Sequence, residues 1–305
     1  MKKILAIDVG GTKLIYALIN EKGEFLTGVN RIPTPKNIEE LKSLFKKIIL
    51  ENEQEIDMTA FATAGAVNIT NTAVKSSTPN LPVGYNNIDF SQLSIKPVYV
   101  ENDANAAAWA EYKLGAAKGD DNTITVTLGT GVGGGIIIEG KLLRGKSGRA
   151  GEVGSMKING RGRICTCGRK DCWESYASGT GLKKTAYETA LYDEIFNESI
   201  YKNKKPEEIT TYDIIDGVNF NDEYSKKVFE IWKKDLITGL INLVDIFDTE
   251  SIIISGGLGK FINASEAQEV INSEIVTGEV KVRLANMGNY AGMIGAALLA
   301  YEKFS

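Results

Sequence analysis

The sequence repeats one pattern at the start of each half: an apolar strand, a glycine turn and a second strand. In the first half, strands predicted at residues 3–8 and 14–19 flank a glycine turn, and in the second half strands at 124–128 and 136–139 flank GTGVGGG. A tight glycine turn between two strands is typical of an antiparallel hairpin. Because the same pattern opens both halves, we predict a duplicated α/β fold.

The spacing of apolar residues elsewhere in the chain also fits an α/β fold. Leu41, Leu44, Phe45, Ile48 and Ile49 recur at helical spacing and predict one face of a helix at 37–54. Further strands are predicted at 59–63, 98–100 and 251–255, and further helices at 104–114, 222–247 and 291–303. Residues 115–121 resemble a linker, and 197–213 are polar and predicted to lie at the surface. We therefore expect two domains, with these bounds: 1–117 with 291–305 packing back on it, and 118–290.

Composition excludes several classes of function. The chain has 305 residues, a formal net charge of -4 and no histidine. Every mechanism that uses imidazole as base or metal ligand is thereby excluded, so a general base must be carboxylate, lysine, tyrosine or thiolate. The acidic balance argues against nucleic acid as a partner. We also expect no membrane association and a cytoplasmic location, because the sequence has neither a bilayer-length apolar run nor a secretory leader.

The first glycine turn, in Asp8-Val9-Gly10-Gly11-Thr12-Lys13, has two interpretations. Glycine lets backbone amides approach an anion, while Thr12 adds a hydroxyl and Lys13 a positive charge. Asp8, at the end of a strand, is suited to hold Mg²⁺ through water. The alternative, a plain hairpin turn, is equally consistent with this segment taken alone.

The second turn has five glycines within residues 129–135, including Gly129 and Gly131 around Thr130. A two-residue hairpin needs one or two, so the excess favours a phosphate-binding loop. A third glycine turn, at Gly256-Gly257, follows a strand; it can admit a nucleotide base or ribose against the backbone, or simply join a strand to a helix.

Glu101-Asn102-Asp103 ends a predicted strand and precedes a helix. Asp is a favoured helix N-cap, so Asp103 is expected to cap this helix, to act as a general base for a hydroxyl, or to do both.

The cysteines, Cys165, Cys167 and Cys172, lie within eight residues of one another. This crowding suits reduced thiols or a metal site better than a disulfide framework. Structural zinc takes four ligands, and no histidine exists to complete the set, so only Ser155, a carboxylate or water could do so.

Taken in order, these motifs resemble the ROK family of sugar kinases and sugar-responsive repressors. The resemblance runs through AIDVGGTK, VENDANAAAWAE, LGTGVGGG, AGEVGS, CTCGRKDCWESYASG, IIISGGLG and AGMIGAALLA, which span nearly the whole chain. It implies an actin/hexokinase/ribonuclease H-like duplicated fold with a nucleotide and sugar cleft between two domains, and a homodimer.

The resemblance also implies roles for individual residues. Asp103 would take the proton from a sugar hydroxyl, normally O6, as it attacks the γ-phosphate of ATP, with Mg²⁺ near Asp8. Gly65, Asn102, Glu152 and Glu174 match sugar-binding positions, and Ser77-Thr78-Pro79-Asn80 lies near them. The ATP phosphates and nucleoside would be held by the three glycine turns, at these residues: Asp8, Gly10, Gly11, Thr12, Lys13, Thr130, Gly131, Gly256 and Gly257.

The chain departs from the family at Ser155, where the family usually has a histidine that ligates zinc and contacts the sugar. Ser155 is therefore a candidate sugar contact, and the zinc site formed by the three cysteines is expected to be degraded. We expect much less than one zinc per chain.

The motifs favour an enzyme over the alternatives. Repressors of this family carry a helix-turn-helix before the first strand, which here starts at Lys3. A non-catalytic sugar sensor would not need both Asp8 and Asp103, and a heat-shock-type or actin-like ATPase would lack Glu152 and Glu174. The resemblance implies a kinase, with N-acetylmannosamine as the first candidate substrate, glucose as the alternative, and fructose or a β-glucoside after these.

Overall fold

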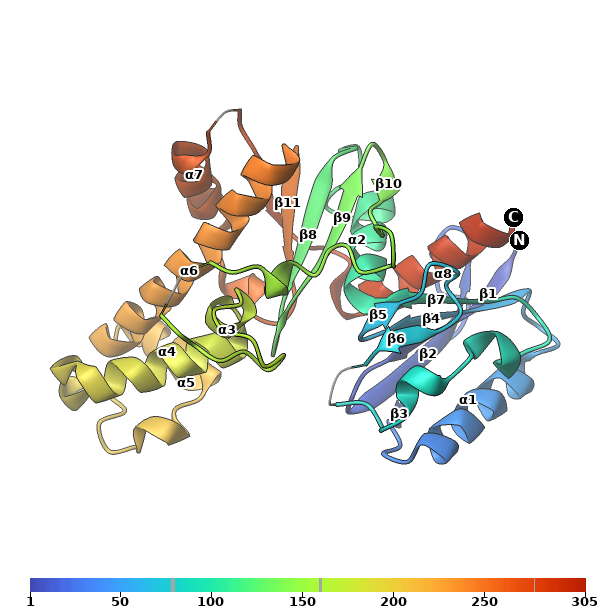
Figure 1. Ribbon diagram of the computed structural model, residues 1–305, viewed down its shortest axis with the longest axis horizontal. Coiled ribbons are helices and arrows are strands. Elements are labelled where there is room, and N and C mark those ends of the chain that lie inside the picture. The colour runs from blue at the N-terminus through green and yellow to red at the C-terminus, as the bar shows by residue number, and fades with distance from the viewer. Residues whose placement is uncertain (78–79, 159–160, 277) are drawn as a thin grey trace. The chain divides into compact units, whose positions relative to one another are not determined.

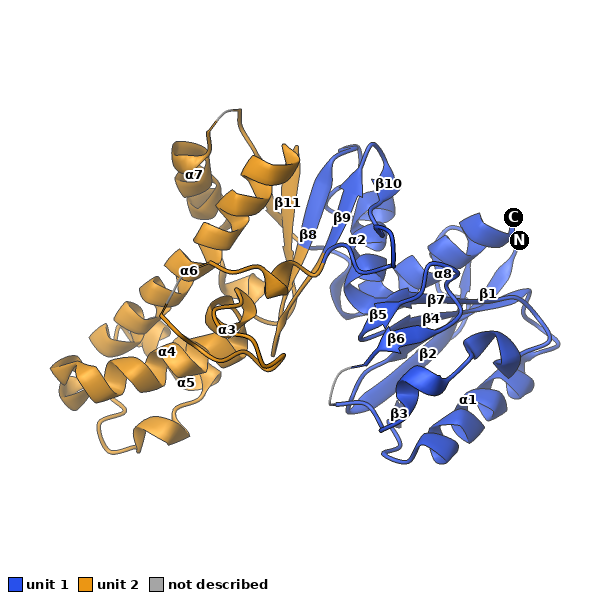
Figure 2. Cartoon of the chain, in the orientation of Figure 1, with its two compact units in different colours: residues 1–125, 135–151, 285–305 blue, residues 126–134, 152–284 orange. Residues whose placement is uncertain are grey.

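The computed structural model describes residues 1–77, 80–158, 161–276 and 278–305 (Figure 1). The chain forms two compact units (Figure 2). Unit 1 comprises residues 1–125, 135–151 and 285–305, and unit 2 comprises 126–134 and 152–284.

Unit 1 contains a five-stranded sheet whose register positions its functional residues. The strand order is β3 (Asn30–Pro33), β2 (Lys13–Asn20), β1 (Lys3–Val9), β4 (Met58–Thr63) and β7 (Val98–Asn102). β1, β2 and β3 pair antiparallel, as the glycine hairpin predicts, whereas β1, β4 and β7 are parallel. Val9 pairs with Thr63 and Thr63 with Asn102, so the three parallel strands end at one edge. The short strands β5 (Ala66–Val67) and β6 (Val74–Ser76) form a separate ribbon.

Helices cover both faces of this sheet. Alternate residues of β1 enter two cores, as the pleat requires. Ile4 and Ala6 pack with α2 (Asp103–Leu114) and α8 (Ala291–Phe304), and Leu5 with α1 (Ile38–Asn52). α2 and α8 approach so closely that a Cβ on Gly295 would lie 1.7 Å from the carbonyl oxygen of Ala106, and only glycine fits there.

The second sheet has the order β10 (Lys141–Leu142), β9 (Val132–Ile138), β8 (Thr123–Leu128), β11 (Ser251–Ser255) and β12 (Lys281–Leu284). Its helices are α3 (Glu174–Ala177), α4 (Gly179–Tyr192), α5 (Thr211–Asn219), α6 (Glu223–Phe247) and α7 (Ala264–Glu274). Each sheet contains a strand pair joined by a glycine turn, and the predicted duplicated α/β class is confirmed. Across the described ranges, α6 included, no helix is both long enough and apolar enough to cross a bilayer.

The unit limits differ from the domain limits expected at 117/118 and 290/291. Residues 135–151 belong to unit 1. The reason is visible at Gly135, where a Cβ would lie 2.4 Å from the Cβ of Ala108 on α2, so that β9 packs with its backbone against that helix. This close approach leaves no local sequence pattern beyond the glycine itself.

Candidate functional site

Two carboxylates predicted to be functional lie at the carboxyl ends of the parallel strands β1, β4 and β7 in unit 1. Asp8 lies in β1, one residue before the end of that strand, and Asp103 follows β7 as the first residue of α2. The parallel register places both at the same edge of the sheet. Their carboxylates are close enough for Asp103 to raise the pKa of Asp8. The structure thus brings together a phosphate-type turn and a candidate base.

The first glycine turn lines a pocket of about 390 Å³. The Gly10 amide donates to the carbonyl of Lys13 at 3.1 Å, and the Thr34 hydroxyl donates to the carbonyl of Gly10 at 2.6 Å. The Lys36 ammonium donates to the carbonyl of Gly11 at 2.6 Å. These bonds fix the conformation of the turn. All five predicted residues of this turn line the pocket, namely Asp8, Gly10, Gly11, Thr12 and Lys13.

Asp8 lies in an electrostatic environment that suits a cation. Burial first, and the negative charge of Asp103 second, raise its pKa to about 7, while Lys13 opposes the rise. The repulsion between the two neighbouring carboxylates is only partly offset by Lys13. Their oxygens are the ligand type that Mg²⁺ prefers, and the ion can bind them largely through its own water molecules. The residues present therefore fit the magnesium ion that the sequence predicts.

Asn102, not Asp103, caps α2, which corrects the capping expectation. The Asn102 side-chain oxygen accepts from the Asn105 amide at 3.0 Å, because residue 102 keeps an extended backbone while residue 103 is already helical. The Asn102 amide group also donates to the carbonyl of Gly65 at 3.1 Å. Gly65 has φ of +105°, and a Cβ there would lie 2.2 Å from the carbonyl oxygen of Ser76.

Asp103 is left to face solvent. The protein around its carboxyl nevertheless removes part of the hydration of the charged form and so raises the pKa, while the Ala104 amide, which donates to it at 2.9 Å, and the amide of Asp103 itself oppose that rise. The residue stays exposed, so a substrate hydroxyl can reach it. Of the neighbouring segment predicted to lie near a sugar, Thr78 and Pro79 are outside the described residues.

Unit 2 joins the second and third glycine turns at a pocket of about 470 Å³. Gly129 and Thr130 line it from one turn and Gly257 from the other. Gly131 and Gly256 shape the turns from behind. A Cβ on Gly131 would lie 2.3 Å from a carboxylate oxygen of Glu174, and one on Gly256 would lie 2.3 Å from the carbonyl oxygen of Leu128.

Sequence reasoning missed several residues of both pockets. In unit 1 the missed lining residues are Ile15, Arg31, Asn289 and Tyr290, and the Arg31 guanidinium donates to the Tyr290 hydroxyl at 3.0 Å. In unit 2 the missed lining residues are Gly179, Thr180, Lys183, Thr211, Tyr212, Leu258, Lys260 and Phe261. One available signal was Ser178-Gly179-Thr180-Gly181, an N-cap and glycines that open α4, because such a helix start favours anions.

Glu174 links the second glycine turn to the cysteine loop within unit 2. Its carboxylate accepts from the Val132 amide at 3.1 Å and from the Thr166 hydroxyl at 2.9 Å, and the Cys165 sulfur lies 3.7 Å from it. The predicted sugar residue is thus placed against the phosphate-type turn. Glu152 is exposed, and its carbonyl accepts from the Ser155 amide at 3.0 Å.

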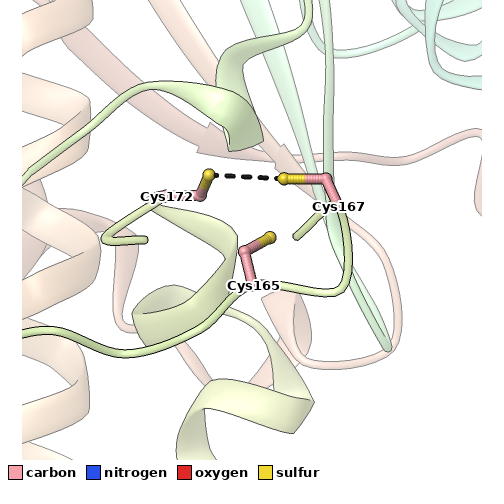
Figure 3. Close-up of side chains that lie close together, drawn as sticks. All are labelled: Cys165, Cys167 and Cys172. Atoms are coloured by element: carbon pink, nitrogen blue, oxygen red, sulfur yellow. Dashed lines mark hydrogen bonds between the residues drawn. The ribbon is translucent and has the colours of Figure 1, made fainter. Parts of the chain in front are cut away.

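The three cysteine sulfurs converge, all within 4.8 Å of one another (Figure 3). Sγ of Cys167 and Sγ of Cys172 are 3.6 Å apart, and the Arg169 guanidinium lowers the pKa of the Cys167 thiol. Tetrahedral zinc, with Zn–S of about 2.3 Å, needs sulfurs about 3.8 Å apart. The spacing fits three zinc ligands. Ser155 lies beside this loop, because its carbonyl accepts from Arg169 at 3.3 Å, but a serine hydroxyl is a poor fourth ligand.

The pKa of Asp8 generates a stability prediction. The folded-state pKa of about 7 exceeds the ordinary aspartate value of 3.8, so the folded protein retains this proton to higher pH than the unfolded chain. The associated stabilisation is complete below about pH 4 and is lost as pH rises through about 7. Relative to Asp8→Asn, the wild-type free energy of unfolding should fall by on the order of 2 kcal/mol between about pH 4 and pH 8, allowing for the partial exposure of Asp8.

Urea denaturation of both proteins, without Mg²⁺ or nucleotide, measures this difference. A difference in unfolding free energy that stays constant across the range would contradict the assignment of a raised pKa to Asp8.

Comparisons with known proteins agree with these motifs. A sequence model of the ROK family matches residues 4–303. Glucokinase from Streptomyces coelicolor is 33% identical, with 98% of this chain and 97% of that protein covered. N-acetylmannosamine kinase from Yersinia pestis is also 33% identical, with 98% and 99% covered. The crystal structure of a ROK family glucokinase from Streptomyces griseus in complex with glucose and AMPPNP matches with a TM-score of 0.80 at 30% identity, covering 98% of this chain and 99% of that one. The chain belongs to the ROK family.

Proposed function

We propose that this protein is an ATP-dependent sugar kinase that phosphorylates the 6-hydroxyl of a hexose or N-acetylhexosamine. The observation that carries the proposal is the shared edge of the unit 1 sheet, where Asp103 stands beside the phosphate-type turn that follows Asp8. Relatives at 33% identity are named glucokinase and N-acetylmannosamine kinase, which supports the same reaction class.

The chemistry follows from the groups at this edge. Phosphoryl transfer needs in-line positioning and neutralised charge more than covalent help. Asp103 accepts the proton of the attacking hydroxyl, and its raised pKa brings it closer to the operating pH. Asp8 would hold the magnesium ion, which supplies charge neutralisation at the phosphoryl group. Lys13 and the amides of Gly10 and Gly11 offer further positive partners to phosphate oxygens.

The unit 2 pocket is suited to the nucleoside. Leu258 and Phe261 give it an apolar wall, while Lys183 and Lys260 offer charge to phosphates. The second glycine turn is held by α4, since the Gly179 amide donates to the Gly129 carbonyl at 2.8 Å. An adenine ring needs an apolar slot with few polar groups, and the phosphates need amides and cations. The Streptomyces griseus glucokinase forms a complex with AMPPNP, which supports ATP as the donor here.

For the sugar, we propose N-acetylmannosamine as the first candidate and glucose as the alternative. Asn102, Gly65, Glu152 and Glu174 are assigned to the hydroxyls by the family motif, with Ser155 at the position of the missing histidine. The bond between Asn102 and the Gly65 carbonyl supports a preformed sugar side in unit 1. We further propose a cytoplasmic homodimer that uses neither nucleic acid nor membrane as a partner.

We predict that the purified protein carries much less than one zinc per chain. The three thiols fit the metal, but the chain has no histidine to serve as the fourth ligand, and incomplete sites bind zinc more weakly. Elemental analysis after mild chelation measures the content. Ser155→His supplies the missing ligand type and should raise the zinc content. Near-stoichiometric zinc in the wild type that resists chelation would contradict the prediction.

Asp103→Asn should abolish sugar-dependent ADP formation, with a loss of kcat of about 100-fold or more, because an amide cannot accept the proton. Sugar binding, measured by calorimetry, should be retained, since Asn102 and its bond to Gly65 are untouched. Turnover near the wild-type rate would refute the role of Asp103 as base. Asp89→Asn is a matched control that removes the same charge, because Asp89 is an exposed N-cap of the short helix at Phe90–Leu93.

A coupled ADP assay across N-acetylmannosamine, N-acetylglucosamine, glucose, mannose, fructose and cellobiose identifies the sugar. We expect the highest kcat/KM with N-acetylmannosamine. The 6-deoxy analogue of the best substrate should inhibit without turning over. Much more efficient turnover of glucose would transfer the assignment to glucokinase, and ADP formation independent of any sugar would favour the ATPase alternative.

A further inference from the structure

Glu101, the residue before the Asn102-Asp103 pair, is a buried carboxylate that the mechanism does not use. Only 2% of its surface is exposed. A buried charge is tolerated when it is paired and its lone pairs are filled. Six donor atoms surround Glu101, within hydrogen-bond distance of its two oxygens. They belong to Asn71, Tyr99, Asn102, Asn105 and Arg144.

These donors tie together separate parts of unit 1. Oε1 accepts from the Asn102 amide at 3.1 Å and from the Asn105 side chain at 3.2 Å, which fixes the end of β7 to the first turn of α2. Since side chains alternate along a strand, Glu101 points away from the face that Asn102 presents to Gly65. Glu101 therefore acts on the site through the backbone and not by contact with a substrate.

The charge partner of Glu101 is Arg144. Its Nε and Nη2 atoms lie 3.0 Å and 2.7 Å from Oε2, and Nη2 also reaches the Tyr99 hydroxyl. A planar guanidinium can hold both acceptors at once, whereas a lysine ammonium is a point charge. Through these bonds Arg144 connects its own segment, residues 143–151, to β7, the strand that directly precedes the candidate base Asp103.

That segment is also held at its other end. The Ala150 amide donates to the Arg144 carbonyl at 3.2 Å. Gly148 has φ of +79°, and a Cβ there would lie 2.0 Å from the Val67 carbonyl oxygen, so the backbone lies directly against β5. The next residues along the chain lead into Glu152, a predicted sugar ligand. The position of Arg144 therefore constrains the start of that motif as well.

We propose that Arg144 is a positioning residue for the sugar side of the reaction. It orders two segments together: the Asn102-Asp103 strand end, through Glu101, and residues 145–151, through its own backbone. The inference rests on the proposed sugar kinase function and assigns that site a residue that touches no substrate.

The test uses a charge-neutral pair, because Arg144→Met alone would leave Glu101 buried without its cation and can fail to fold. In the double variant Glu101→Gln/Arg144→Met no uncompensated charge remains. We expect kcat/KM for the sugar to fall by about 10- to 100-fold, the cost of a small misplacement of reacting groups. The KM for ATP should stay within about twofold, since the unit 2 pocket is unchanged.

Two further variants sharpen the comparison. Arg144→Lys keeps the charge but cannot bridge Glu101 and Tyr99, so its sugar kcat/KM should lie between the wild type and the double variant. Arg149→Met is the matched control, an exposed arginine in the same segment, and should behave like the wild type. Wild-type sugar kinetics in the double variant would mean that Arg144 only balances the Glu101 charge, and would overturn the proposal.

Hydrogen exchange of the backbone amides gives a readout that is independent of turnover. In the double variant, exchange should accelerate at residues 102–106 and at 145–151 together, but not in α6. Unchanged exchange in either segment would overturn the proposal. If the wild-type protein turns over no sugar, the proposed function fails on that result, while the exchange data still decide whether Arg144 orders both segments.

Discussion

The register of three parallel strands is the constraint on which the unit 1 site depends. Val9, Thr63 and Asn102 are paired across β1, β4 and β7, so whatever follows each strand emerges at one edge. Asp8 and Asp103 meet there. Lost hydration raises both pKa values, and the charge of Asp103 adds to the rise at Asp8. In the function that we propose, a cation near Asp8 and a proton taken up by Asp103 would relieve this repulsion.

Two glycines of the second turn are required for packing, whether or not the turn binds phosphate. Of the five glycines in residues 129–135, Gly131 admits the Glu174 carboxylate and Gly135 admits α2, each at a distance that a Cβ would block. The glycine excess that favoured a phosphate loop in the sequence therefore has a partly structural cause. The phosphate interpretation remains supported for the pocket lined by Gly129 and Thr130, because the side chains of Lys183 and Lys260 and the first residues of α4 also line it.

Local sequence patterns were sufficient to predict most helices and strands. Apolar periodicity placed α1 and α6 within a few residues, and glycine turns located both hairpins. Side chains that converge from distant segments left no such pattern. Tyr212 belongs to the pocket although residues 197–213 read only as polar surface, and Arg31 reaches the first turn from β3. Asn102 and not Asp103 is the N-cap because the backbone of residue 102 is still extended, with ψ of 140°. The residue types alone do not predict at which of these two positions the helix begins.

Two carboxylates two residues apart show how the surroundings of a side chain decide whether it can serve as the base that we propose for this chain, which has no histidine. Glu101 is surrounded by six donor atoms, those of Arg144 among them, and its lone pairs are occupied. Asp103 accepts from the Ala104 amide and remains exposed, with a raised pKa. A base is useful when it is accessible and its pKa lies near the operating pH. The donors around the two carboxylates therefore differ: Glu101 is enclosed by them, whereas Asp103 stays accessible for the role of base that we propose for it.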